Sequence, residues 1–333
     1  MTNEVIAAID IGGTKIALGL SDLEGRPRLP FRRFPTDVAR GPHRILEQAL
    51  DELERMAGET GARVAAVGVG CGGPLSRRRG LILSPANLPG WDEFPIVDLI
   101  RERLRVPVEL DNDANAAALA EHEYGAGRGA ESMVYMTIST GIGGGVILGG
   151  RLIHGVGDAA GEVGHMIVKP DGAPCGCGAR GCLETICSGT SIARRAAERL
   201  SNGAQSSALL DGGGSLRAIT AKAVAEAARA GDPVASEVWD ETIEYLALGV
   251  GNVIAAFAPE AVVLGGGVST AGEQLLEPLR RRVNESVKIA PVDEIRIVQA
   301  ALGGDSGVYG ALILGRQALA ARQSQGDATP SRA

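Results

Sequence analysis

The sequence predicts an α/β protein made of two lobes. Short apolar runs rich in β-branched residues alternate with segments of helical periodicity, a pattern typical of that class. A strand, a glycine-rich turn and a returning strand occur twice, over residues 5–20 and 133–148. At 333 residues the chain is also too long for one small core. We therefore expect each lobe to open with such a hairpin.

The first lobe is predicted to span residues 1–118. Its hairpin has strands over 5–9 and 16–20, with a turn between them at residues 10–15. Apolar residues at helical spacing then predict a helix, which Gly58 and Gly61 end. In chain order, the remaining expected elements of this part are the helix over 43–57, a buried strand over 64–69, a helix over 96–104, a strand over 106–110 and a helix over 115–124.

The second lobe is predicted to span residues 119–305, and a final helix over 306–322 is expected to complete the first lobe. The strand over 133–138 enters a glycine turn at 139–145, and residues 146–148 leave it. The polar segment 323–333 is expected to be a disordered tail. Between these, the pattern predicts helices over 192–200, 220–230 and 234–257, a strand over 261–264, a helix, and a strand over 294–298.

Composition excludes several classes of protein. The net charge is −7 and aromatic residues make up 3%, which argues against a nucleic-acid binder with a basic surface or stacking aromatics. We see neither an N-terminal signal pattern nor an apolar stretch of about 18 residues. A cytoplasmic protein that binds neither nucleic acid nor membrane is therefore expected.

One glycine-rich stretch contains a complete set of soft metal ligands. The spacing H-x9-C-x-C-x4-C suits tetrahedral zinc, and four protein ligands would close the coordination sphere, so one structural zinc per chain is predicted. In a reducing compartment this spacing favours a metal over disulfides. Glu162 and Glu184 flank the set as free acceptors for substrate hydroxyls. The predicted ligands are His165, Cys175, Cys177 and Cys182.

The first glycine turn carries groups that suit a phosphate. Asp10 ends a strand, the amides of Gly12 and Gly13 can approach an anion, and Thr14 and Lys15 add a hydroxyl and an amine. An ordinary hairpin turn is the alternative. A P-loop is excluded because the chain contains no Gly-Lys dipeptide.

Two later glycine turns strengthen the nucleotide hypothesis. Residues 139–145 offer a similar amide-rich concavity, and Gly265–Gly267 follow a third strand. By contrast, residues 68–73 match G-x-G-x-x-G but lead into Pro74 and an arginine run, without the helix that a dinucleotide site requires. We therefore reject a nicotinamide cofactor.

Polar residues also gather where a strand meets a helix, at Asp111–Asn115. Asp113 is a candidate general base and Asn112 can bond a sugar hydroxyl, although an ordinary helix N-cap is the alternative. The remaining histidines show no partner pattern and are expected to be structural, and Arg77–Arg79 is expected to be a solvated turn. Those histidines are His43, His122 and His154.

Together these residues resemble the ROK family (repressor, open reading frame, kinase) of sugar kinases. The similarity rests on residues 10–15, 87–91, 112–115 and 161–184, and it spans roughly residues 4–320. It implies a two-lobed actin-like (ribonuclease H-like) fold with an interlobe cleft. Repressors of the family carry an N-terminal helix-turn-helix domain, and a phosphate loop at residue 10 leaves no room for one, which favours the kinase.

The resemblance also implies roles for individual residues. Asp113 would be the catalytic base, and ATP would bind with Mg²⁺. The residues implied to bind substrate are Gly72, Gly73, Asn87, Asn112, Glu162, His165 and Glu184. Those implied to bind the nucleotide are Asp10, Gly12, Gly13, Thr14, Lys15, Thr140, Gly141, Gly143, Gly265, Gly266 and Gly267.

The implied activity is phosphorylation of the 6-hydroxyl of glucose by ATP, in a homodimer. Two alternatives stay open at this point. One is a kinase for an N-acetylhexosamine, either N-acetylglucosamine or N-acetylmannosamine. The other is a sugar-sensing regulatory protein without turnover.

Overall fold

The computed structural model describes residues 3–85, 87–210 and 215–327. The chain divides into two compact units. Unit 1 comprises the chain up to Ala120, the short segment His154–Ala159 and the chain from Gly304 onward. Unit 2 comprises Glu121–Ile153 and Ala160–Gly303. Among the described residues, no helix is long and apolar enough to cross a membrane.

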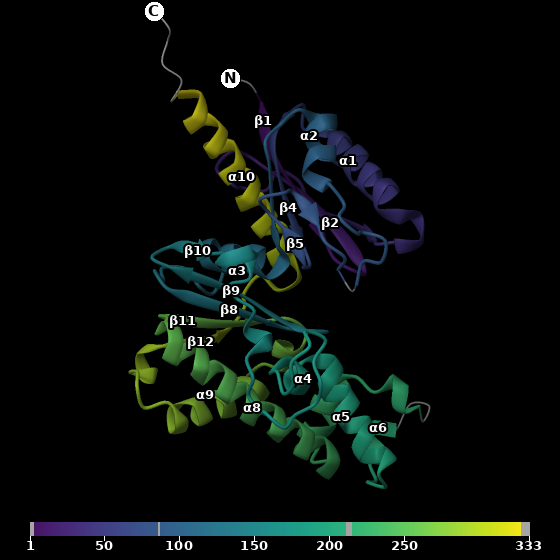
Figure 1. Ribbon diagram of the computed structural model, residues 1–333, viewed down its shortest axis with the longest axis vertical. Helices are drawn as coiled ribbons and strands as arrows, with labels where there is room; N and C mark the ends of the chain where they lie inside the picture. The colour runs from purple at the N-terminus through teal and green to yellow at the C-terminus, as the bar shows by residue number, and fades with distance from the viewer. Residues whose placement is uncertain (1–2, 86, 211–214, 328–333) are drawn as a thin grey trace, which may run out of the picture. The chain divides into compact units, whose positions relative to one another are not determined.

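Unit 1 is built on a five-stranded sheet of order β3-β2-β1-β4-β7 (Figure 1). β1 pairs antiparallel with β2 and parallel with β4, and β4 pairs parallel with β7. A short two-stranded ribbon, β5 (Leu75–Ser76) with β6 (Leu81–Ile82), follows β4. The sheet strands are β1 (Glu4–Ile11), β2 (Lys15–Ser21), β3 (Arg32–Pro35), β4 (Arg63–Cys71) and β7 (Val108–Asn112).

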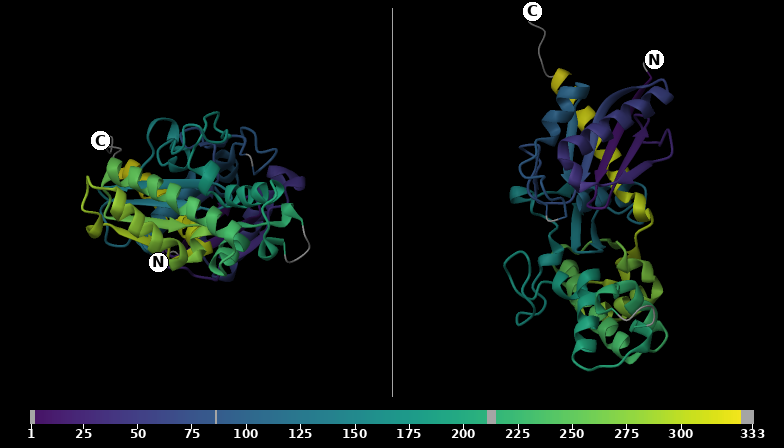
Figure 2. Two further views of the ribbon diagram at one scale, coloured as in Figure 1. Left: turned by 90° about the horizontal axis from the view of Figure 1, so that it is seen from below. Right: turned by 90° about the vertical axis from the view of Figure 1, so that its right-hand side faces the viewer.

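Helices cover both faces of this sheet, because the strands are apolar on both sides. Val5, Ala7 and Ile9 of β1 face one core with α1 (Gly41–Glu59) and α2 (Ile96–Leu104). Ile6 and Ala8 face the other core with α10 (Ser306–Asp327), as Figure 2 shows for α1 and α10. Each fully buried aliphatic side chain contributes about 1.5–3 kcal/mol.

Unit 2 repeats the plan of unit 1. Its sheet has the order β10-β9-β8-β11-β12, with β8 antiparallel to β9 and parallel to β11. In both sheets the first strand of the unit therefore lies centrally and returns through a hairpin. The strands are β8 (Met133–Ile138), β9 (Ile142–Leu148), β10 (Arg151–Ile153), β11 (Ala261–Gly265) and β12 (Arg296–Gln299).

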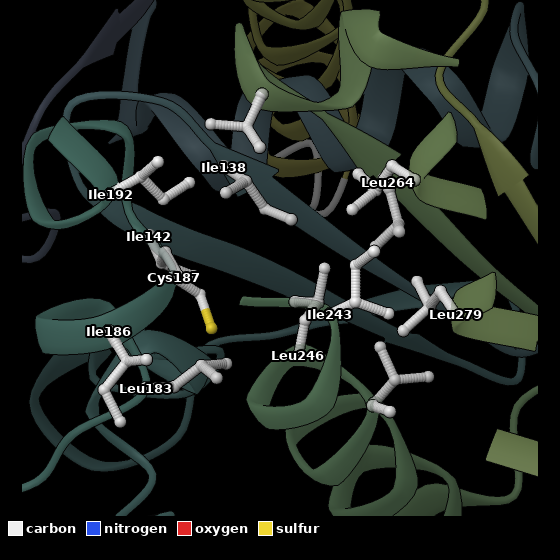
Figure 3. Packing of buried hydrophobic residues seen from close by; sticks show 14 of the residues in the cluster. Ile138, Ile142, Leu183, Ile186, Cys187, Ile192, Ile243, Leu246, Leu264 and Leu279 are labelled. Carbon is white, nitrogen blue, oxygen red and sulfur yellow. The ribbon is translucent and has the colours of Figure 1, made fainter. Parts of the chain in front are cut away.

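One face of the second sheet packs against helices to form the larger core, part of which Figure 3 shows. Ile138 and Leu264 point from the sheet toward Leu246 and Leu279 of the helices. Asp232 caps the longest of them by accepting the Ala235 amide at 2.9 Å. The helices are α4 (Glu184–Cys187), α5 (Gly189–Ser201), α6 (Ser207–Leu210), α7 (Ala221–Arg229), α8 (Pro233–Phe257) and α9 (Glu273–Ser286), and α3 (Asp113–Glu123) spans the boundary of the units.

Most predicted elements are confirmed within two or three residues, and three predictions are wrong in detail. The second glycine turn is shorter than expected, because 142–145 belong to β9 and pair with β8. The strand predicted over 106–110 begins at Val108. Residues 323–327 of the predicted tail continue α10, and 328–333 lie outside the described residues.

The G-x-G-x-x-G match has a packing explanation. Residues 68–71 are part of β4, and no helix follows at once, so the rejection of a dinucleotide loop is confirmed. A Cβ on Gly68 would lie 1.8 Å from the carbonyl oxygen of Ala311. Glycine is needed there because α10 lies directly against the strand.

Candidate active site

The candidate base lies at the junction of β7 and α3. Asp113 is the first residue of α3, and its Oδ1 accepts the Ala114 amide at 2.8 Å. Asn112 Oδ1 accepts the same amide at 2.8 Å. Both side chains therefore help to cap the helix, as the alternative interpretation expected. Asp113 Oδ2 is not used in these bonds and can act on a substrate.

The pKa of Asp113 is raised above that of an ordinary carboxyl group. The residue is exposed, but the protein around the carboxyl group desolvates it and raises its pKa, while the amide hydrogen bonds oppose that rise. A partly desolvated carboxylate is a better proton acceptor than a free one.

Other predicted sugar residues lie close to this junction. A Cβ placed on Gly72 would be 3.6 Å from Asp113 Oδ2 and 3.7 Å from the side-chain amide of Asn87. A Cβ on Gly73 would be 3.1 Å from Asn112 Nδ2. In unit 1, Gly72 thus lies near both Asp113 Oδ2 and Asn87, and Gly73 lies near Asn112.

The first glycine turn meets the same group of residues. A Cβ on Gly13 would lie 2.8 Å from the Asn87 carbonyl oxygen. Burial, followed by the charge of Asp113, raises the pKa of Asp10 to about 7, while Lys15 and Arg33 act to lower it. A carboxyl group that titrates near neutral pH therefore lies close to the cations Lys15 and Arg33. This combination suits a metal-bound phosphate.

Sequence reasoning missed the residues on the other side of this turn. The N-terminus of α10 packs on Asp10, because a Cβ on Gly307 would lie 2.4 Å from Asp10 Oδ2. Arg33 forms an ion pair with Asp305, just before the helix. The resulting amide-rich helix N-terminus favours anions. Only tertiary contacts reveal it, since Asp305 and Asp10 are far apart in the sequence.

The second glycine turn lies beside another helix N-terminus. The Ser139 carbonyl accepts the Gly189 amide at 2.7 Å, and the Thr140 carbonyl accepts the Thr190 hydroxyl at 2.7 Å, both from α5. Of the predicted nucleotide residues here, Thr140 and Gly141 lie in the turn. Gly143 instead pairs with β8 as part of β9.

The third glycine turn borders a small cavity that the sequence did not predict. Gly265 is the last residue of β11, and Gly266 and Gly267 lead into a turn of 3-10 helix that begins at Val268. The cavity has a volume of about 130 Å³ and lies between this turn and α7. Its walls are about equally polar and apolar, so it offers both packing and hydrogen-bonding groups beside a glycine turn. Its lining includes Ala225, Val268 and Trp239 together with the charged residues Lys222, Glu226 and Arg229.

The predicted metal ligands come together in unit 2. Their four donor atoms all lie within 4.8 Å of one another. Cys177 Sγ is 3.7 Å from Cys182 Sγ, and Cys175 Sγ is 3.6 Å from His165 Nδ1. Tetrahedral zinc with a Zn–S bond of about 2.3 Å requires donor separations of roughly 3.6–3.8 Å. The donor chemistry fits this ion, and these two separations match it.

The acidic residues beside the metal ligands have different surroundings. Glu162 is exposed, and its Oε2 lies 3.8 Å from His165 Nε2. The two ring nitrogens of His165 thus face different groups, Nδ1 the cysteines and Nε2 the carboxylate. Glu184 Oε2 accepts the Ile142 amide at 2.7 Å, so one oxygen of this residue is already bonded to the backbone.

Two side chains expected to be unremarkable are part of a polar network. His154 Nε2 lies 2.7 Å from Asp111 Oδ2, a partner that the sequence pattern did not indicate. Arg77 is not a solvated residue, because its side chain is only 23% exposed and pairs with Glu109 at 2.6 Å. No sequence signal linked these residues, because they come from separate parts of the chain. Arg77 follows β4, Asp111 lies in β7, and the segment His154–Ala159 returns to unit 1 from unit 2.

The fold and the comparisons define the class of protein. The chain has the two-lobed actin-like fold of sugar kinases. The sequence profile described as "ROK family" matches residues 6–318. The chain therefore belongs to the ROK family.

Individual relatives agree over nearly the whole chain. A glucokinase from Halalkalibacterium halodurans is 39% identical over 316 residues, which are 93% of this chain and 94% of that protein. A solved ROK hexokinase from Thermus thermophilus has a TM-score of 0.81 at 37% identity, covering 95% of this chain and 99% of that one. A ROK family glucokinase from Streptomyces griseus, solved with glucose and AMPPNP, has a TM-score of 0.78 at 37% identity and covers 94% and 99%.

Proposed function

We propose that this chain is an ATP-dependent hexokinase that phosphorylates the 6-hydroxyl of glucose to give glucose 6-phosphate. The observation that carries the proposal is the position of Asp113 Oδ2 beside Gly72 and Asn87, in a family whose relatives above include glucokinases. Phosphoryl transfer depends mainly on alignment and charge stabilisation, and a carboxylate that receives the hydroxyl proton is the one acid–base group it needs.

In the proposed mechanism, Asp113 accepts the proton of the 6-hydroxyl as that oxygen attacks the γ-phosphorus. The raised pKa of Asp113 strengthens it as a base while the hydroxyl is being deprotonated. Asn112, which caps α3 beside it, keeps its side-chain amide nitrogen available to the sugar. We propose that the residues that hold the hexose are Gly72, Gly73, Asn87, Asn112, Glu162, His165 and Glu184.

MgATP is the proposed phosphoryl donor. Asp10 would lose its proton when magnesium-bound phosphates approach, because a nearby cation favours the carboxylate. Lys15 and the amides of Gly12 and Gly13 would then neutralise phosphate charge, as would the amides of the second turn. The cavity beside Gly267 would take the adenine base.

Zinc would be held by His165 and the three cysteines. Its contribution when bound is to hold the residue 162–184 segment in one conformation, since a closed set of four protein ligands leaves no position for substrate. His165 would keep its Nε2 for a sugar hydroxyl because Nδ1 faces the cysteines. We also propose that the chain works as a homodimer in the cytoplasm, where its thiols stay reduced.

Release of ADP with each of five sugars tests the proposal. The panel is glucose, mannose, fructose, N-acetylglucosamine and N-acetylmannosamine, each with MgATP. We expect the highest kcat/KM for glucose, with glucose 6-phosphate as the product. A preference for an N-acetylated sugar would support kinase activity but assign a different substrate. Sugar binding without ADP release from any of the five would instead indicate a sugar-sensing protein.

A further inference from the structure

The segment His154–Ala159 is a short excursion of the chain into unit 1. β10 before it and the residues from Ala160 after it belong to unit 2. Val156, in the middle of the segment, is 96% exposed. Burial of this side chain therefore contributes nothing to fixing the segment.

Polar contacts at its two ends hold the segment instead. His154 Nε2 lies 2.7 Å from Asp111 Oδ2, and Asp158 Oδ2 accepts the Arg77 amide at 3.1 Å. Asp158 has a left-handed φ of 60°, an uncommon conformation for a residue other than glycine. The segment is thus tied to the end of β7 and to the turn after β5.

Asp111 connects His154 to the catalytic junction. Its side chain is 1% exposed. Oδ1 accepts the Asn112 amide at 2.8 Å and the Asn115 side-chain amide at 2.9 Å, while Oδ2 accepts from His154. A buried carboxylate that loses a donor is strongly destabilised, so rotation of Asp111 would disturb the contacts on both oxygens.

In this structure Arg77 does not donate a hydrogen bond to Asp111. Its Nε lies 3.3 Å from Asp111 Oδ2, but the geometry does not make a hydrogen bond. The rest of its guanidinium is directed to Glu109 at 2.6 Å and to Asp158 at 3.8 Å. Within the part of the chain that the structure describes, His154 is therefore the one hydrogen-bond donor to Asp111 Oδ2. Because a carboxylate only accepts, His154 Nε2 carries the hydrogen.

We propose that His154 is a positioning residue for phosphoryl transfer. Through Asp111 it fixes the junction of β7 and α3, so that Asn112 and Asp113 keep the orientation that the reaction requires. The inference rests on the proposed function, because it assigns Asp113 as the base. It is expected to affect kcat more than the glucose KM, because Asp113 is the proposed base whereas Asn112 is only one of several residues proposed to hold the hexose.

Steady-state kinetics of three variants provide the first test. For His154→Ala we expect kcat to fall about 10- to 100-fold, the effect of a base displaced by about 1 Å, with the glucose KM changed less than about twofold. His154→Gln should restore most of kcat, because its amide nitrogen can reach the position of Nε2. His43→Ala is the matched control in unit 1, where His43 on α1 contacts Phe94 edge-on, and it should keep wild-type kinetics.

Two kinetic outcomes would overturn the inference. One is an unchanged kcat with a raised glucose KM. The other is a His154→Gln variant as slow as His154→Ala when both are as folded as wild type. Comparing Asp111→Asn with the Asp111→Asn/His154→Ala double variant adds a check. Once Asp111 is replaced, the additional His154→Ala change should lower kcat little further.

Amide hydrogen exchange separates this inference from the proposed function, because it does not need turnover. In His154→Ala, the amides of Asn112 and Ala114 should exchange at least about tenfold faster than in wild type, since their acceptors lose a fixed orientation. His43→Ala should leave them unchanged. Unchanged protection in His154→Ala would overturn the positioning role, whereas absence of ADP release by the wild-type protein would count against the proposed function alone.

Discussion

The junction that carries Asp113 and the segment that carries Glu162 and His165 are held in different ways. The junction ends a strand paired to β4, and the side chains of Asp111 and Asn112 accept the nearby amides. The segment from 160 to 184 is mostly irregular. Its regular structure is a turn of 3-10 helix at 163–165 and two isolated bridges, one of them Ile167 to Cys182.

This difference shows two ways to prepare polar groups for a substrate. Backbone and side-chain hydrogen bonds within the protein are sufficient for Asp113. For Glu162 and His165, the four donors of the metal set add to backbone hydrogen bonds such as that from the Leu183 amide to the Met166 carbonyl at 2.9 Å, and zinc binding of this kind contributes about 10–16 kcal/mol in small peptides. Changes aimed at one region should therefore affect kcat, and changes aimed at the other should affect sugar affinity and stability.

The largest expected effect is on the junction. Asp113→Asn keeps the shape and the acceptor for the Ala114 amide but removes the base, so kcat should fall roughly 10²- to 10⁴-fold while glucose still binds. Turnover by ADP release and binding by calorimetry measure the two quantities. Asp98→Asn on α2, an exposed aspartate that pairs with Arg101, is the matched control and should be neutral. Near-normal turnover of Asp113→Asn would refute the base assignment.

The next effect concerns the metal-bound segment. Cys177 is exposed, so Cys177→Ser removes a thiolate ligand with little loss of packing. We expect wild type to contain one zinc per chain and the variant much less. Loss of an outer-shell partner already costs about 10- to 100-fold in metal affinity or activity, so loss of a ligand should lower glucose affinity by about 100-fold. Elemental analysis and calorimetry measure both.

Cys187→Ser is the cysteine control for that experiment. Cys187 is buried and donates to the Thr242 carbonyl, away from the metal ligands. This variant should keep one zinc per chain. If Cys177→Ser kept full zinc content and wild-type glucose affinity, the metal ligands would not be what holds Glu162 and His165, and the contrast with the Asp113 junction would be lost.

A third, smaller effect tests how β9 supports the same segment. A Cβ on Gly144 would lie 2.7 Å from Val163 Cγ2 and 2.8 Å from the Gly161 carbonyl oxygen. Gly144→Ala should therefore push the turn that carries Glu162 and cost about 1–3 kcal/mol of stability. Gly176→Ala meets no atom within 4 Å and should cost less. Urea unfolding compares them, and equal losses would contradict the packing argument.

The smallest expected effect is a pH dependence centred on Asp10. The folded pKa of Asp10 is raised from 3.8 to about 7, first by burial and then by the charge of Asp113. Between these values the folded protein binds more protons than the unfolded chain, so the contribution of Asp10 to stability falls as pH rises from about 4 to 7.

Ligand binding should show the opposite trend, because Mg²⁺ and phosphates need the carboxylate. The ionised fraction of Asp10 rises about tenfold between pH 6 and pH 8, so the KM for MgATP should fall by up to that factor. Asp10→Asn should remove this part of the pH profile. A wild-type KM that does not change between these pH values would show that ionisation of Asp10 does not limit nucleotide binding.

The local elements and the metal ligands could be predicted from the sequence because their signals are local. Helical spacing over 43–57 and 234–257 located α1 and α8, and the cysteine spacing gathered donors that the structure places within 4.8 Å. The second glycine turn was misjudged because glycine favours turns, yet Gly144 lies in a strand for close packing. Local pattern does not distinguish these two uses of glycine.

The sequence alone determined the two hairpins, the α/β class, the soft donor set and the candidate base, since each depends on neighbouring residues or fixed spacing. Tertiary structure decided what surrounds them. The approach of Gly307 to Asp10, the raised pKa values of Asp10 and Asp113, and the contact of His154 with Asp111 join segments far apart in the chain. Burial and long-range hydrogen bonds exist only after folding, and for that reason composition and periodicity could not reveal them.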